Sequence, residues 1–111
     1  MIIATIKVKA FSVKRKEILQ TIQAIIERVK QEKGCLDAIG YQDIDDDNTF
    51  CLVEKWESQR DLDNHIKYNT FSALLGTKIL LSEPMEINFM VVSYKAGVEV
   101  VEALRGQSIQ T

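Results

Sequence analysis

The fold is decided by one stretch of the sequence, Phe50-Cys51-Leu52-Val53-Glu54-Lys55-Trp56. Its first half is apolar at every position, which is typical of a central strand that is covered on both faces. An acidic run, Asp45-Asp46-Asp47-Asn48, precedes it, and a further strand-like segment, 35–44, precedes that run. Because Asp and Asn between apolar segments favour turns, 35–44 and 49–56 are predicted to form a β-hairpin.

Two more strands and a long helix are predicted on either side of the hairpin. Residues 2–9 and 85–94 place apolar side chains at every second position, which indicates strands. Between the first strand and the hairpin, apolar residues recur every three or four positions, which predicts a helix over 13–33. Ser12 is suited to cap its start, and Gly34 to end it.

A second helical region is predicted to begin at Ser58, with Asp61 at the capping-box position. Tyr68-Asn69-Thr70 marks an expected break, and Pro84 ends the region because proline cannot extend a helix. One apolar face is expected along it: Leu62, His65, Ile66, Phe71, Leu74, Leu75, Ile79 and Leu80. The 98/101/104 spacing of apolar residues predicts a terminal helix over 97–105.

The order of these elements, β-α-β-β-α-β, predicts a ferredoxin-like α+β domain over residues 1–96 with a four-stranded antiparallel sheet. Right-handed crossovers place both helical regions on one face of the sheet. Several strands are nevertheless apolar on both faces, so we expect two copies to pack sheet to sheet as a homodimeric α+β barrel. Residues 97–111 form a C-terminal extension, which we expect to contact the partner.

Composition excludes several classes of function. The chain has 111 residues and a net charge of −2, with no basic face for nucleic acid. The apolar segment at the start of the chain is interrupted by Lys7 and Lys9, so it is too short for a signal peptide or a membrane span. We therefore expect a cytoplasmic protein with reduced cysteines. The hairpin register sets Cys51 opposite a residue near 42, too far from Cys35 for a disulfide.

No metal site is expected either. One histidine and two cysteines at these separations match no zinc spacing, and the acidic turn lacks the glycine and distal glutamate of a calcium loop.

Four motifs together resemble the antibiotic biosynthesis monooxygenase family over about residues 2–94. They are Gly34-Cys35-Leu36, the acidic turn at 45–48, Glu54-Lys55-Trp56, and His65 followed six residues later by Phe71. The resemblance implies a cofactor-independent monooxygenase that acts on a small aromatic or quinol-like molecule with molecular oxygen. An isomerase or a quorum-signal-processing enzyme of the same fold is one alternative, and a non-enzymatic dimeric ligand-binding or stress-response module is another.

The sequence departs from the family at two positions. Haem-degrading relatives carry a tryptophan where this chain has His65, and a haem-ligating histidine where it has Leu75. The resemblance therefore implies no haem. Many members also carry a second histidine where this chain has Thr70, so a mechanism that uses two histidines is not expected.

His65, the sole histidine, is the candidate catalytic base, because imidazole titrates near neutral pH. The alternative is a packed histidine that is hydrogen-bonded to a neighbour. Trp56 and Glu54 share a strand face and are candidate substrate-binding residues, although core packing for Trp56 and a structural partner for Glu54 remain open. Tyr41, Tyr68 and Phe71 complete the candidate pocket, and for each of them plain packing is the alternative.

Overall fold

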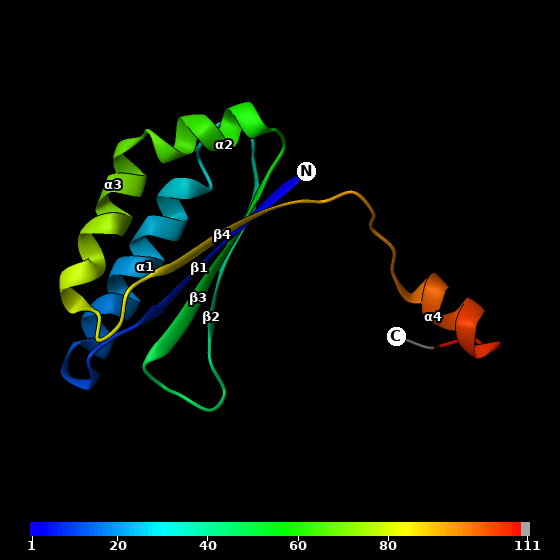
Figure 1. The fold of residues 1–111 in the computed structure, drawn as a ribbon, viewed down its shortest axis with the longest axis horizontal. Coiled ribbons are helices and arrows are strands. Elements are labelled where there is room, and N and C mark those ends of the chain that lie inside the picture. Colours follow the sequence, from blue (N-terminus) through cyan, green and yellow to red (C-terminus); the bar gives the residue numbers. More distant parts are fainter. Residues whose placement is uncertain (110–111) are drawn as a thin grey trace.

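The computed structural model describes residues 1–109 as a four-stranded sheet covered on one face by helices (Figure 1). The strands are β1 (Ile2–Lys9), β2 (Cys35–Gln42), β3 (Thr49–Trp56) and β4 (Glu86–Val91). The helices are α1 (Arg15–Val29), α2 (Gln59–Ile66), α3 (Asn69–Gly76) and α4 (Val98–Arg105). Two short 3-10 helices, η1 (Ser12–Lys14) and η2 (Thr77–Leu80), precede α1 and follow α3.

The strand order is β2-β3-β1-β4, and every neighbouring pair is antiparallel. The predicted ferredoxin-like α+β fold is therefore confirmed. In the register of the sheet, Ile2 lies beside Trp56 on one side and Val91 on the other. Cys51 lies opposite Tyr41, one residue from the predicted position, and both cysteines are free.

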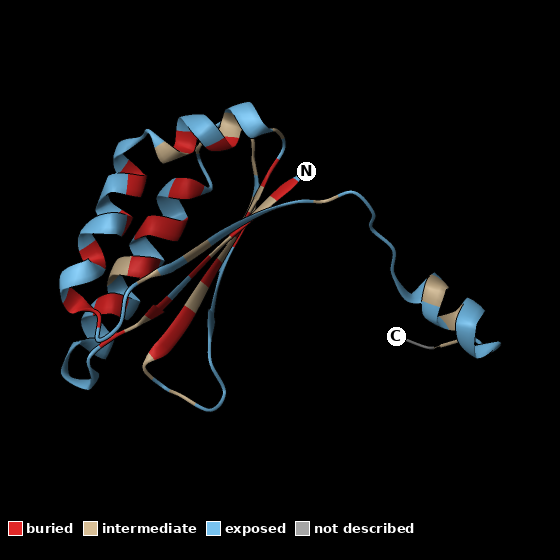
Figure 2. Cartoon of the chain, viewed as in Figure 1, coloured by how far each residue is buried: buried red, intermediate tan, exposed pale blue. Residues whose placement is uncertain are grey.

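The core lies between the sheet and the helices α1, α2 and α3 (Figure 2). Alternate residues of β1 are buried there: Ile2, Ala4, Ile6 and Val8. Burying each such aliphatic side chain stabilises the fold by about 1.5–3 kcal/mol relative to leaving it exposed.

The opposite face of the sheet is not covered by any of the described elements (Figure 1). Side chains alternate along a strand, so the residues between the buried ones point to this face. It includes one apolar row, Ile39 beside Val53, and a second apolar pair, Ile3 beside Met90. Ile39 and Met90 are 40% and 46% exposed, so the face is apolar and open to solvent.

The first long helix is shorter than predicted. α1 ends at Val29 rather than near residue 33, and Ser12 makes no capping hydrogen bond to it. The N–H groups of Gln31 and Glu32 bond three residues back, so the chain tightens into a turn before β2. Gly34 has a φ of +83°, a conformation that side-chain-bearing residues rarely adopt.

The second helical region follows the sequence closely at its start. The Ser58 hydroxyl accepts a hydrogen bond from the Asp61 N–H at 3.2 Å, as expected of an N-cap. The predicted break between α2 and α3 is present. The single predicted apolar face was wrong at Leu75 and Ile79, which are 45% and 77% exposed, because the break and the 3-10 turn change the helical register.

Candidate functional site

His65 lies on the inner face of α2 and is only 2% exposed. Its Nδ1 is 2.9 Å from Oε1 of Glu32, which lies in the turn after α1. Its Nε2 is 3.1 Å from Oε1 of Glu54 on β3, close enough for an ion pair but without the alignment of a hydrogen bond. The imidazole is thus held between two carboxyl groups, one on each side of the ring.

Two aromatic side chains complete the surroundings of His65. The ring of Trp56 stacks on the imidazole, with centroids 4.4 Å apart and planes 28° apart. Its Nε1–H donates to Oε1 of Glu54 at 3.1 Å, which satisfies the indole where it is fully buried. Phe71, from α3, meets the imidazole edge-on at 5.4 Å. A protonated imidazole would be stabilised by the face of Trp56.

Three segments that are distant in sequence bring these groups together. Alternation along β3 points Glu54 and Trp56 to the helix-covered face of the sheet. The Ser58 cap begins α2 immediately after β3 and sets His65 two turns in, above that strand. The turn after α1, in the connection between β1 and β2, carries Glu32.

Burial alone would lower the pKa of His65. The carboxylate of Glu54, and then that of Glu32, outweigh burial and raise the pKa above its ordinary value. His65 is therefore protonated more readily than an ordinary histidine. Burial, and then the charge of Glu54, raise the pKa of the nearby Cys35 thiol, so this cysteine is not a reactive thiolate.

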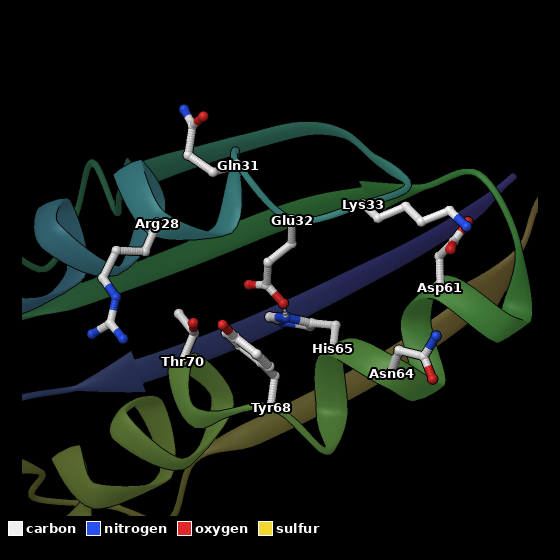
Figure 3. Close-up of a pocket in the computed structure, with 9 residues that line it drawn as sticks. All are labelled: Arg28, Gln31, Glu32, Lys33, Asp61, Asn64, His65, Tyr68 and Thr70. Carbon is white, nitrogen blue, oxygen red and sulfur yellow. Dashed lines mark hydrogen bonds and ion pairs between the residues drawn. The ribbon is translucent and has the colours of Figure 1, made fainter.

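A cavity of about 500 Å³ opens beside the Glu32–His65 pair (Figure 3). Its lining comes from the end of α1, the following turn, α2 and the start of α3: Arg28, Gln31, Glu32, Lys33, Asp61, Asn64, His65, Tyr68 and Thr70. Figure 3 shows the Glu32 side chain reaching across to His65, while Arg28 and Gln31 point away. The side chain of Glu32 is 15% exposed and that of His65 only 1%, so Glu32 is the more accessible partner.

The structure divides the site residues that the sequence suggested. His65 and Tyr68 line the cavity, whereas Glu54 and Trp56 are fully buried and Phe71 packs on the imidazole. Tyr41 lies at the far end of β2, where it lines two other depressions.

Sequence reasoning missed Glu32. The sequence does contain a pattern that points to Glu32. Ile25, Val29 and Glu32 continue the buried stripe of α1 at spacings of four and three residues. A charged side chain at the next inward position of such a stripe needs a buried partner.

Two buried carboxylate oxygens of the site, Oε2 of Glu32 and Oε2 of Glu54, have no hydrogen-bond partner among residues 1–109. Such atoms are costly when unpaired, and Oε2 of Glu32 belongs to a side chain that lines the cavity. Across the same residues, no group of three or more His, Cys, Asp and Glu side chains is placed to hold a metal ion.

Most of the chain matches one protein family. A model described as antibiotic biosynthesis monooxygenase matches residues 1–75 of the chain. The chain belongs to the antibiotic biosynthesis monooxygenase family. Within residues 1–109, no helix of this family member is long and apolar enough to cross a membrane.

Two named proteins resemble this antibiotic biosynthesis monooxygenase family member. "Putative monooxygenase YcnE" of Bacillus subtilis is 26% identical over 88 residues, covering 78% of this chain and 93% of that protein. "Uncharacterized protein sll1783" of Synechocystis is 30% identical over 81 residues, covering 72% of this chain. The match spans only 55% of the Synechocystis protein, about half of its length.

Solved structures confirm the family fold. A structure from Deinococcus radiodurans described as a "putative antibiotic biosynthesis monooxygenase" superposes with a TM-score of 0.81 at 19% identity, covering 87% of this chain and 97% of that one. A conserved protein from Methanosarcina mazei gives a TM-score of 0.75 at 26% identity, covering 80% and 89%. At these identities the likeness concerns the fold.

The raised pKa of His65 predicts how stability depends on pH. Unfolded histidine titrates near pH 6.5, so between that pH and its higher folded pKa the native state holds more protons than the unfolded state. The stabilisation is complete below about pH 6.5 and is lost as pH rises through the folded pKa. Urea unfolding from pH 6 to 8.5 should therefore show a decreasing free energy of unfolding, and His65→Gln should flatten that dependence. Parallel curves for the two proteins would contradict it.

Proposed function

We propose that this protein is a cofactor-independent monooxygenase that acts on a small aromatic, quinol-like molecule. The observation that supports it is the Glu32–His65 pair beside a cavity large enough for such a molecule. Family membership and the resemblance to a protein named as a monooxygenase point to the same class of reaction.

Removal of a proton from the substrate is the step that these residues would catalyse. Both nitrogens of His65 face carboxyl groups and its pKa is raised, so it is not a free base. Glu32 lines the cavity, and we propose that its unpaired Oε2, which is buried in this structure, turns to the cavity when substrate binds and accepts the hydroxyl proton. The imidazole behind Glu32 holds that carboxylate in place through the 2.9 Å contact, and His65 is thus the catalytic partner of Glu32.

The deprotonated quinol is electron-rich and can pass an electron to O₂ while it is bound in the cavity. Recombination places one oxygen atom on the substrate, and the other leaves as water with electrons that the substrate supplies. Tyr68 provides an aromatic wall, and Arg28 and Lys33 provide positive charge at the rim of the cavity. Trp56 and Glu54 would act from behind the imidazole by holding it in place.

Oxygen uptake tests the proposal. The full chain should accelerate O₂ consumption by a panel of hydroquinones, naphthoquinols and anthrones beyond their autoxidation, with one O₂ consumed per substrate. Glu32→Gln should lower the turnover by about 10²-fold, because the amide keeps the shape but cannot take the proton. Glu27→Gln is the matched control, since Glu27 is exposed on α1 and bonds only to Lys30 in an ion pair.

The alternatives give different results in the same assay. Substrate rearrangement without O₂ consumption would indicate the isomerase or signal-processing class. Saturable binding without any turnover would indicate a binding module. Equal turnover for Glu32→Gln and wild type would remove Glu32 from the chemistry.

We further propose that the protein is a homodimer packed sheet to sheet. The uncovered apolar face, with Ile39 and Met90 exposed on it, supports this arrangement. Two-fold pairing would cover the same patch on both copies.

A further inference from the structure

The cavity beside Glu32 and His65 has a second side that the proposed proton transfer does not use. This side comes from the end of α1 and the start of α3, and its lining includes Arg28 and Thr70. The two helices pack against each other, and the last turn of α1 lies at the same end of the domain as the first turn of α3 (Figure 1). Both sides face one space of about 500 Å³.

Thr70 carries a hydroxyl that has no partner inside the described part of the protein. The residue is only 1% exposed, yet its Oγ1 makes no hydrogen bond within residues 1–109. The hydroxyl of Thr77, which is also buried, donates to the carbonyl of Leu74 at 2.7 Å. Unlike the unpaired oxygens of Glu32 and Glu54, the Thr70 hydroxyl is not fully sealed. It therefore opens to the cavity that Thr70 lines (Figure 3).

The start of α3 adds unpaired N–H groups beside this hydroxyl. Tyr68 precedes the helix without capping it through its side chain, and the first turn contains no acidic residue. The carbonyl of Tyr68 accepts the N–H groups of Phe71 and Ser72. Those of Asn69 and Thr70 have no acceptor within residues 1–109, as is usual for the first N–H groups of a helix. The positive end of the α3 dipole is thus left uncompensated.

The charged side chains of the cavity leave positive charge on this side. The carboxylate of Glu32 is held by His65, and that of Asp61 is bonded to the N-cap of α2. Arg28 forms no ion pair with any carboxylate of residues 1–109. In Figure 3 its side chain points away from the Glu32–His65 pair and ends level with Thr70. A guanidinium group and an open helix N-terminus are both suited to bind a carboxylate or a phosphate.

We propose that the first turn of α3, the Thr70 hydroxyl and the Arg28 guanidinium form an anion subsite, which binds a carboxylate or phosphate substituent of the substrate. This inference deepens the proposed function and rests on it for the identity of the substrate. The hydroxyl of the quinol lies at Glu32, and its anionic substituent lies at Thr70. The substrate class is thereby narrowed to quinol-like aromatic molecules with an acidic substituent.

Calorimetric titration with small aromatic anions tests the subsite without any oxygen chemistry. Benzoate and phenyl phosphate are the probes, and benzamide is the neutral control that has the shape of benzoate. The wild-type chain should bind at least one of the two anions at least about 10-fold more tightly than benzamide, as expected for charge-assisted hydrogen bonds. The anion with the lower dissociation constant identifies the substituent.

Substitutions of Thr70 test the contribution of its hydroxyl. Thr70→Val keeps the branched shape but removes the hydroxyl, so it should weaken anion binding about 10-fold and change benzamide binding less than about 3-fold. Thr70→Ser restores the hydroxyl and should bind the anion within about 3-fold of wild type. Thr21→Val is the matched control, because Thr21 lies on α1 outside the cavity and donates to the carbonyl of Glu17.

A substitution of Arg28 tests the contribution of the guanidinium. Arg28→Gln should weaken anion binding about 10-fold, because it removes a charge-assisted contact. Arg60→Gln removes the same charge from an exposed position of α2 that does not line the cavity, and it should change anion binding less than about 3-fold. The pair separates a direct contact from the general charge of the domain.

The outcomes separate the subsite from the oxygenase. Anions that bind no more tightly than benzamide would overturn the subsite, and turnover of unsubstituted hydroquinone would then leave the oxygenase standing. Anion binding that either Thr70→Val or Arg28→Gln leaves unchanged would also overturn the subsite. Selective anion binding that both variants weaken, without turnover of any quinol, would support the subsite and overturn the oxygenase. Unchanged circular dichroism of each variant would show that its domain is folded.

Discussion

Glu54→Ala is expected to lower the free energy of unfolding by about 3–5 kcal/mol, since it removes one partner from a buried charged group. Glu54 is 1% exposed, and its Oε1 lies 3.1 Å from both the Trp56 Nε1 and the His65 Nε2. Without it, an indole N–H and an imidazole nitrogen lose their neighbour in the core. Urea unfolding at pH 7 measures the change.

Glu57→Ala provides the control for this loss of stability. Glu57 lies three residues after Glu54, immediately after β3, and is exposed, so its truncation should change the free energy of unfolding by less than about 0.5 kcal/mol. Should Glu54→Ala prove insoluble, Glu54→Gln keeps an oxygen for the Trp56 N–H and should show a smaller loss. Equal stability of Glu54→Ala and Glu57→Ala would mean that the buried pair contributes nothing.

His65→Ala is expected to lower oxygen turnover by about 10²-fold, as Glu32→Gln does, because His65 acts through Glu32. The substitution removes the imidazole that holds Glu32 at 2.9 Å, so the proton acceptor loses its orientation. Single-turnover oxygen consumption with the best substrate of the panel measures it.

Lys67→Ala is the control for His65→Ala, because Lys67 is exposed at the end of α2 and does not line the cavity. Its turnover should match wild type. Unchanged turnover of His65→Ala would remove His65 from the mechanism, and the Glu32 result would then have to be explained without a charged pair.

Most of the fold could be predicted because its signals are local. The alternation of buried and less buried side chains along residues 2–9 and 49–56 indicates a sheet with helices on one face. The acidic turn joins two strands in a register that the structure confirms. The end of α1 was harder to predict, since the chain leaves the helix at Val29 through three-residue hydrogen bonds that the apolar pattern does not encode. Leu75 is exposed although Phe71 and Leu74 of the same helix are buried, because the chain breaks at Tyr68 and only a narrow side of the new helix α3 faces the core.

The candidate site was only partly predictable because it joins three distant segments. The residue types at 54, 56 and 65 were informative, since a histidine on an apolar helix face and a glutamate between buried strand residues both require partners. These residues become one another's partners only because α2 packs over β3, and no local sequence pattern predicts that packing. Glu32 belongs to the cluster because the turn after α1 places it beside His65. Tyr41 does not, because it lies on β2 at the other end of the sheet.

The positive φ of Gly34 has a consequence for how well this cluster can be aligned. A β-carbon at this position would collide with the Asp61 carboxylate, which belongs to the first turn of α2. The Gly34 carbonyl also accepts the N–H of Glu57 at 2.8 Å, just before that helix begins. At Gly34, the loop that carries Glu32 is therefore joined to the segment before α2 by a backbone hydrogen bond, and it contacts α2 itself through the Asp61 side chain. A methyl group at residue 34 would push the Asp61 side chain, and with it α2, away from the loop. The distance between the Glu32 carboxylate and the His65 imidazole would then increase.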